Sequence, residues 1–257
     1  MSRSPAWDLE LLKLRRSSVA RTAAAVLVAG TSSMTAVFAA VGLSGGESQM
    51  ALKVAPMLQG EGWQAYLGLL GQVLSVAMLL CAGVVLSWSV GREFADGTIA
   101  CLLALPTPAR SVLVAKLGTV TLGAIACGVA TVVVAVPLGL LVGLGPPGPE
   151  ALLGALKAVA IATLTVVLTL PLAWVASVRR GYLPGVGALL GVVVVTQIAT
   201  VAGAGAWFPW AAPGLWAGMG GAAAAGAVGP AQLLLAVPVG VVAVGATVRW
   251  WSTAELR

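Results

Sequence analysis

The side chains able to do chemistry are few in this chain of 257 residues, and they lie in short groups. Only 9% of the residues are charged, with fourteen Lys and Arg and eight Asp and Glu. Because the chain has no histidine, it offers no histidine metal site, no Ser-His-Asp triad and no histidine proton switch. Cys81, Cys101 and Cys127 form no CxxC pair and are odd in number, which argues against a disulfide framework or a metal cluster. We therefore expect no cofactor, no metal and no catalytic residue.

The most specific charged group is the segment Gly91–Lys116, GREFADGTIACLLALPTPARSVLVAK. Its charged residues Arg92, Glu93 and Asp96 are followed by an apolar run between residues 99 and 103. The segment is far longer than a connection between two helices needs. A charged and then amphipathic helix at a membrane surface suits docking onto another protein. The alternative is a helix that rests on the lipid and binds nothing.

A second charged group lies at the start of the chain. Trp7, Leu11 and Leu14 recur at i, i+4 and i+7 among charged residues, which predicts an amphipathic helix in the membrane interface. The alternative is an ordinary charged entry to a membrane helix. If the helix is amphipathic, exchanging Glu10 and Lys13 should have little effect on assembly or stability.

The elements that position these groups are membrane spans. The chain is 60% hydrophobic with a mean hydropathy of +1.03, whereas a soluble chain carries roughly 25% charged residues. A helix needs about 20 apolar residues to cross a bilayer. The uncharged runs therefore predict an all-α integral membrane protein with six transmembrane helices, over residues 22–43, 62–91, 117–145, 158–178, 183–205 and 228–248.

The sequence divides this single transmembrane domain (1–257) into spans and three other segments. They are the leader (1–20), the charged segment (91–116) and an extracytoplasmic or re-entrant segment (206–227). Tryptophan prefers the headgroup level. We expect Trp7, Trp88, Trp174, Trp250 and Trp251 at one membrane surface and Trp63, Trp207, Trp210 and Trp216 at the other, with none at mid-depth.

The basic residues predict the orientation. Twelve of the fourteen fall on one side of the predicted spans, and only Lys53 and Lys157 fall on the other. The positive-inside rule then places both termini of this multi-pass protein in the cytoplasm. The expected location is the plasma membrane of a bacterium. The net charge of +6 follows from this asymmetry, so we expect no nucleic-acid partner.

The charged segment resembles the signature of type-2 ABC transporter permeases. In that signature span two runs into Arg-Glu-Phe, followed by Gly-Thr, Leu-Leu, Leu-Pro, an Arg and a Lys that opens span three. The matching positions are Arg92-Glu93-Phe94, Gly97-Thr98, Leu102-Leu103, Leu105-Pro106, Arg110 and Lys116. Two features depart from the pattern. Ala95 stands where an acidic residue is frequent, with Asp96 beside it. Arg110 follows Pro106 by four residues, whereas the family commonly has a spacing of three.

The resemblance implies that this segment is a cytoplasmic coupling helix seated on an ATPase. The residues that carry the coupling on this interpretation are Arg92, Glu93, Phe94, Asp96, Gly97, Thr98, Pro106, Arg110 and Lys116. The chain has no G-x-x-x-x-G-K-[ST] phosphate loop, so ATP hydrolysis is expected from a separate subunit. The expected assembly pairs two copies of the ATP-binding subunit with this permease and a second, identical or homologous permease.

The expected function is an ATP-driven exporter, and its cargo is open. No Asp, Glu, Lys or Arg lies deep in a predicted span, which favours a hydrophobic or amphipathic cargo such as a peptide, drug-like molecule or lipid. Polar residues in the spans more often join helices than touch cargo, so the substrate-binding residues are unknown. Two alternatives remain: a secondary, ion-coupled carrier and a non-transport polytopic membrane protein.

Overall fold

The computed structural model describes residues 5–43, 49–103 and 107–253. Within these ranges the secondary structure is helical and no strand occurs. The elements are α1 (Pro5–Arg16), α2 (Ser18–Ala25), the π-helical turn η1 (Val26–Gly30), α3 (Thr31–Leu43), α4 (Gln49–Val54), η2 (Ala55–Met57), α5 (Gly62–Ala95), α6 (Ile99–Leu103), α7 (Ala109–Leu141), α8 (Pro149–Val167), α9 (Pro171–Val178), α10 (Tyr182–Val201), η3 (Gly205–Trp207), α11 (Ala212–Ala217), α12 (Gly221–Gly226), α13 (Pro230–Leu234) and α14 (Ala236–Thr253).

Six helical stretches are long and apolar enough to cross a membrane, which confirms the predicted number. They cover residues 18–43, 62–95, 109–141, 149–178, 182–201 and 230–253. Several extend beyond the uncharged runs: α5 continues past Arg92 to Ala95, and α7 begins at Ala109 and includes Lys116. The connection between these two long helices is therefore shorter than the predicted segment 91–116.

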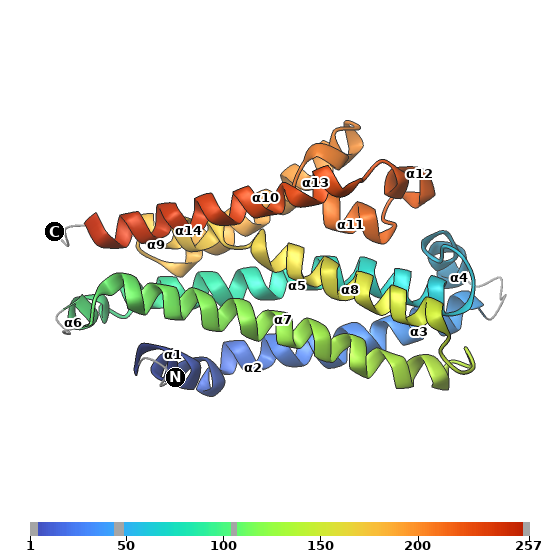
Figure 1. Cartoon of the computed structure of the whole chain (residues 1–257), viewed down its shortest axis with the longest axis horizontal. Coiled ribbons are helices and arrows are strands. Elements are labelled where there is room, and N and C mark those ends of the chain that lie inside the picture. The colour runs from blue at the N-terminus through green and yellow to red at the C-terminus, as the bar shows by residue number, and fades with distance from the viewer. Residues whose placement is uncertain (1–4, 44–48, 104–106, 254–257) are drawn as a thin grey trace.

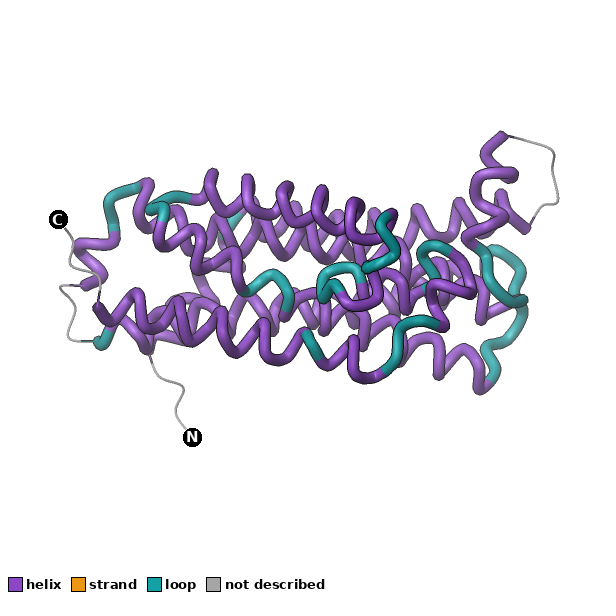
Figure 2. Tube along the Cα trace, turned by 90° about the horizontal axis from the view of Figure 1, so that it is seen from above, coloured by secondary structure: helices purple, strands orange, loops and turns teal. Residues whose placement is uncertain are grey.

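The long helices lie side by side and give the molecule two ends (Figures 1 and 2). We call one the Glu93 end, because α5 finishes there beside α1, α6 and the last turns of α14 (Figure 1). The other is the Trp63 end, where α5 begins near α4. Helix α5, with 34 residues, is about 51 Å long and runs the full length between them.

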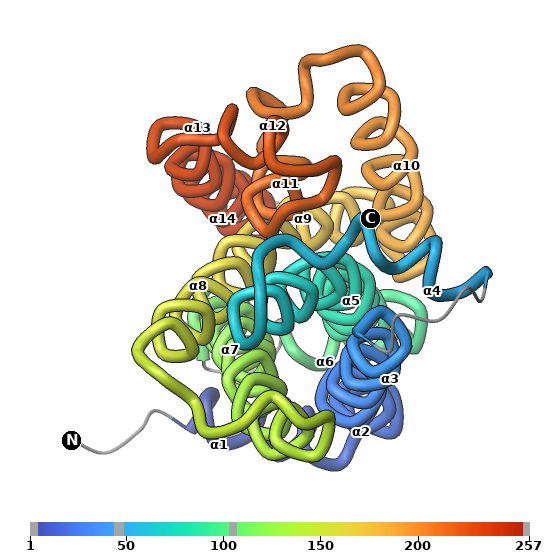
Figure 3. The backbone as a smooth tube through the Cα atoms, turned by 90° about the vertical axis from the view of Figure 1, so that its right-hand side faces the viewer, coloured from blue at the N-terminus to red at the C-terminus, as the bar shows by residue number. Residues whose placement is uncertain are grey.

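Helix α5 is the centre of the bundle. In the view along the helices it is surrounded by α3, α7, α8, α10 and α11 (Figure 3). About 67% of the most apolar 18-residue stretch of α5 is buried, whereas the corresponding stretches of α10 and of the last span are 11% and 22% buried. The helices around α5 therefore turn most of their apolar surface outward, as expected for contact with lipid.

Glycines allow α5 and α10 to touch along the half nearest the Glu93 end. A Cβ at Gly91 would overlap the backbone of Gly181 and Tyr182. One at Gly83 would come within 2.9 Å of Leu189 Cδ1, and one at Gly185 within 2.7 Å of Ser87 Oγ. Small residues at helix crossings permit this backbone approach in membranes.

Several polar side chains inside the bundle connect neighbouring helices. Ser32 Oγ donates to Thr131 O over 3.1 Å, and Thr131 Oγ1 donates to Leu27 O over 3.0 Å, which connects the first span to α7. Gln72 Nε2 donates to Met57 O over 2.9 Å. These bonds satisfy groups that would be costly to leave unpaired in an apolar interior.

The segment between α10 and α13 returns toward the middle of the bundle. Helix α11 packs against α5 and α8, and Trp210 Nε1 donates to Leu168 O over 2.8 Å. Trp210 also packs against a cluster that contains Leu79, which lies midway along α5. This position differs from the headgroup level expected for Trp210. A chain return with buried neighbours can carry an indole inward because its N–H is paired.

Candidate coupling site

Four charged side chains from three helices meet at the Glu93 end. Lys116 Nζ of α7 lies 2.6 Å from Glu10 Oε2 of α1 and 3.0 Å from Glu93 Oε1 of α5. Lys13 Nζ of α1 lies 3.1 Å from Glu10 Oε1 and 3.1 Å from Glu93 Oε1. We call these four residues the charge cluster.

Three of the four residues of the charge cluster are almost removed from solvent. Lys116 is 1% exposed, Glu10 3% and Glu93 4%. An unpaired ion in such a place costs several kcal/mol, but here two carboxylates face two ammonium groups and the formal charges cancel. For half-buried Lys13, burial lowers the pKa, but the charges of Glu10 and Glu93 outweigh it and raise the pKa above the ordinary 10.5. Lys13 therefore stays charged at cellular pH.

The chain following α5 folds back onto the cluster. Asp96 caps the helix, and Gly97 takes a left-handed conformation with φ of 68°, which glycine adopts without strain. This turn brings Thr98 Oγ1 to 2.6 Å from Glu93 Oε2, to which it donates a hydrogen bond. Both carboxylate oxygens of Glu93 are thus used within this chain.

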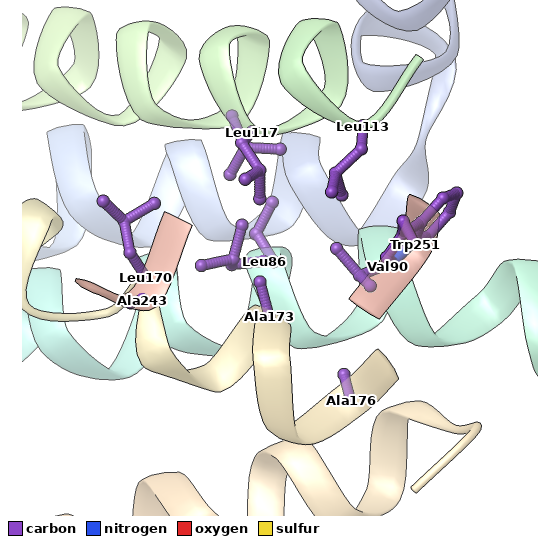
Figure 4. Packing of buried hydrophobic residues seen from close by; sticks show 11 residues of the cluster. Leu86, Val90, Leu113, Leu117, Leu170, Ala173, Ala176, Ala243 and Trp251 are labelled. Carbon is purple, nitrogen blue, oxygen red and sulfur yellow. The ribbon is translucent and has the colours of Figure 1, made fainter. Parts of the chain in front are cut away.

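An apolar cluster supports the same end of α5. Its buried residues come from α5, α7, α9 with the residue before it, and α14. Figure 4 shows Leu113 and Leu117 of α7 pointing toward Leu86 of α5. Phe94 packs edge-on to Trp250 and Trp251 of α14, with ring centroids 5.6 and 5.8 Å apart.

The C-terminal end of α14 is itself bonded to α9. Trp251 Nε1 donates to Ser177 Oγ of α9 over 2.9 Å. Edge-to-face aromatic pairs such as those with Phe94 contribute about 0.5 to 1.5 kcal/mol beyond area burial. The end of α5 is therefore held by the last span as well as by α7.

The N-terminal helix lies against α7. A Cβ at Gly118 would overlap the ring of Trp7, and one at Gly123 would come within 3.3 Å of Leu14 Cδ2. Ser17 separates α1 from α2, and its Oγ accepts a hydrogen bond from Ala20 N over 3.1 Å. The local sequence thus ends α1 and begins the first span with a side-chain cap.

Other residues at the turn face outward. Arg92 lies 4.5 Å above the Trp88 ring and 3.8 Å from Asp96. The exposed surface of this end includes Asp96, Gly97 and Thr98 after α5, Cys101 on α6, and Arg110 in the first turn of α7. We call these five residues the outer surface.

The structure places seven of the nine predicted coupling residues in two groups. Glu93, Phe94 and Lys116 face inward, whereas Asp96, Gly97, Thr98 and Arg110 are exposed, and Arg92 lies between. Pro106 lies outside the described residues.

The Glu93 carboxylate is buried and bonded to Lys13, Lys116 and Thr98 of this chain, and the role of Glu93 in coupling stays a prediction. Glu10 is buried and bonded to Lys116, so it is not a surface charge, and the small effect expected from exchanging Glu10 and Lys13 stays an untested prediction.

Sequence reasoning missed four residues of the site: Glu10, Lys13, Trp250 and Trp251. Glu10 and Lys13 form an i, i+3 pair, which looks like ordinary surface charge pairing in an amphipathic helix. The two tryptophans resemble an interfacial belt. Only the packing of α1 and α14 beside α5 reveals their partners.

The sequence model for the family described as ABC-2 family transporter protein matches residues 8–198, about three quarters of the chain. The chain belongs to the ABC-2 transporter family. No curated protein and no solved structure matches it. The matched region of this ABC-2 permease contains all four members of the charge cluster and the outer surface. Its family implies association with a membrane and with an ATP-binding subunit.

Proposed function

We propose that the chain is the membrane subunit of an ATP-driven exporter, in which the outer surface docks on a cytoplasmic ATP-binding subunit. Two ATP-binding subunits and a second permease, identical or homologous, complete the assembly. The observation that carries the proposal is the exposed turn after α5, which is bonded directly to a buried ionic cluster through Thr98 and Glu93.

The charge cluster would transmit force from that surface. A push on the turn reaches Glu93 through the Thr98 hydrogen bond, and Glu93 is joined to α7 by Lys116 and to α1 by Lys13. Buried ion pairs are short and are costly to separate, so the three helices move as one body. Closure of the ATP-binding subunits would in this way tilt α5 and α7 together and open the cargo path outward.

Cargo selection is proposed to rest on an apolar path with few polar groups. A cavity of about 260 Å³ lies between α5, α8, α10 and α11. Its polar lining residues are Ser75, Thr165, Thr196, Gln197 and Thr200. Drug-sized ligands fill pockets of roughly 300 to 1,000 Å³. This cavity therefore fits one chain or side group of a hydrophobic or amphipathic cargo better than the whole of it.

The docking proposal is tested by purifying the permease in mild detergent with its ATP-binding subunit. Arg110→Glu reverses an exposed charge on the outer surface and should reduce the amount of ATPase recovered per permease. Arg179→Glu is the matched control, because Arg179 is exposed outside the outer surface. Equal recovery from Arg110→Glu and the native chain would reject the docking role, and absence of any ATPase with the native chain would reject the exporter.

The cargo proposal is tested in proteoliposomes that contain the purified complex. Amphipathic peptides, lipids and drug-like molecules are added in turn, and stimulation of ATP hydrolysis is measured with transport. The proposal predicts stimulation by at least one of these classes. Stimulation by small hydrophilic ions alone, or transport driven by an ion gradient without ATP, would favour a secondary carrier instead.

A further inference from the structure

A second cavity lies at the junction of the N-terminal helix and the first three spans. It has a volume of about 290 Å³ and is lined by fourteen residues from the α1, α2, η1, α5 and α7 regions. Twelve of them are apolar or small, and the other two are Arg15 and Arg21. The charge cluster does not line it, so this cavity is separate from the coupling site.

The cavity extends from the surface of the bundle into its apolar part. Arg15 belongs to the last turn of α1 and Arg21 to the first turns of α2, and both are exposed. The inner residues Cys81 and Cys127 stand 14 and 11 positions beyond Ala95 and Lys116 along their helices, about 21 and 16 Å at 1.5 Å per residue. The cavity is thus a slot with a basic mouth and an apolar interior.

These features match one chemistry. The lining on α7 runs from Val120 to Cys127, about 10 Å at 1.5 Å per residue, which accepts part of an acyl chain. A mouth with two arginines favours a negatively charged headgroup over a neutral one. Among the described residues, Arg15 and Arg21 form no ion pair, whereas Lys13, two positions away from Arg15, is held by two carboxylates. The surrounding spans are apolar and long enough to cross a membrane, so lipid is at hand.

We propose that this cavity binds an anionic phospholipid of the leaflet at the Glu93 end, with an acyl chain in the slot and the headgroup phosphate at Arg15 and Arg21. The bound lipid contacts α1 and the first three spans together. It therefore stabilises the seat of the N-terminal helix on the bundle, independently of which cargo or motor the protein uses.

The test uses the full-length permease in nanodiscs that contain phosphatidylglycerol with a photoreactive group midway along one acyl chain. After illumination, peptide mass spectrometry measures labelling at the peptides that contain Cys81 and Cys127. The double variant Arg15→Gln/Arg21→Gln should reduce labelling about 25-fold, taking about a fivefold effect for each basic residue near an anionic surface. The matched double variant Arg179→Gln/Arg249→Gln changes two exposed arginines outside the slot and should leave labelling unchanged.

A second variant tests the slot itself. Ala124→Phe narrows the lining while both arginines remain, and it should remove labelling in the slot but not elsewhere on the protein. Size-exclusion profiles identify variants that fail to fold, and only folded variants are compared. Three results would each overturn the proposal: equal labelling by a phosphatidylcholine probe, no effect of the arginine pair, or labels confined to other surfaces. A Cys127–Cys127 disulfide between two copies, formed when an added oxidant replaces the lipid probe, together with absence of the lipid label, would assign the slot to a permease interface.

Discussion

Lys116 is the residue on which the charge cluster depends most. It is the most buried member of the charge cluster and contacts a carboxylate from α1 and another from α5. A buried cation between two anions stabilises only while both contacts remain, since each ion has lost its hydration. The pairing of Lys116 with Glu10, 106 residues away, joins segments that the sequence gives no reason to connect.

Replacing Lys116 by Met should leave Glu10 and Glu93 buried with one cation, Lys13. Breaking a buried pair from one side costs about 3 to 5 kcal/mol, so we expect a large fall in thermal stability and in folded yield. Lys53→Met, at an exposed position near the Trp63 end, serves as the control. Melting curves in detergent measure the difference, and a Lys116→Met variant as stable as the control would contradict the proposed role of the pair.

Two acidic residues of α1 differ in burial and in ion pairing and allow a comparison. Glu10 is 3% exposed and bonded to Lys116, whereas Asp8 is exposed. Glu10→Gln keeps the shape but removes the charge, so exchange of the α1 backbone amides should accelerate by at least tenfold as the helix leaves its seat. Asp8→Asn should not change it. Hydrogen–deuterium exchange measures both variants, and similar behaviour of the two would show that Glu10 does not hold the helix.

At the scale of elements, the sequence predicts the membrane spans, because contact with lipid excludes charge from them. It does not predict the contacts between helices. The six spans follow from uncharged runs, because a bilayer tolerates few charges in a span. The predicted second span ends before the end of α5 and the predicted third span begins after the start of α7, because the charges of Arg92 and Lys116 indicate water-facing positions. Lys116 instead remains helical and buried, since Glu10 and Glu93 supply its counter-charges.

The segment between α10 and α13 is also predicted only in part. Its position between spans follows from 68 uncharged residues interrupted by Trp, Pro and Gly, but its contact with α5 does not. Gly218 and Gly220, with φ of 111° and 85°, allow the tight turn after α11 that keeps it beside the bundle. Which helix the turn then meets depends on the packing of the whole chain.

The packing of α1 against α7 can be tested without changing a charge. Gly118→Leu places a side chain where the Trp7 ring lies, and overpacking of this kind costs about 1 to 3 kcal/mol. If all of that cost falls on docking, amide exchange in α1 should accelerate about 5- to 150-fold. Gly245→Leu in α14 is the control, because a Cβ there meets no atom within 4 Å. Unchanged exchange in Gly118→Leu would mean that Trp7 does not anchor the helix.

At the scale of the whole molecule, the two ends of the bundle should face opposite sides of the membrane. Gly148 caps α8 at the Trp63 end, and Gly181 caps α10 beside Gly91 near the Glu93 end. A cysteine at position 148 should react with an impermeant maleimide in intact cells, whereas one at 181 should react only after permeabilisation. Reaction of position 181 from outside would contradict both the six-span topology and cytoplasmic termini. The position Gly46, expected on the outer side with Gly148, lies outside the described residues.

The central claim is that the Glu93 end docks on an ATP-binding subunit, and the native Cys101 offers a direct measurement. Cys101 is exposed on α6, while Cys81 and Cys127 are partly buried and can be replaced by Ala. A benzophenone attached to Cys101 in native membranes should capture a polypeptide that mass spectrometry identifies by its phosphate loop. The same probe attached to a cysteine that replaces Gly148, in a chain that also carries Cys101→Ala, should not capture this polypeptide. Capture of that ATPase from Cys101 alone is the predicted result, and capture from neither position or equally from both would contradict the account.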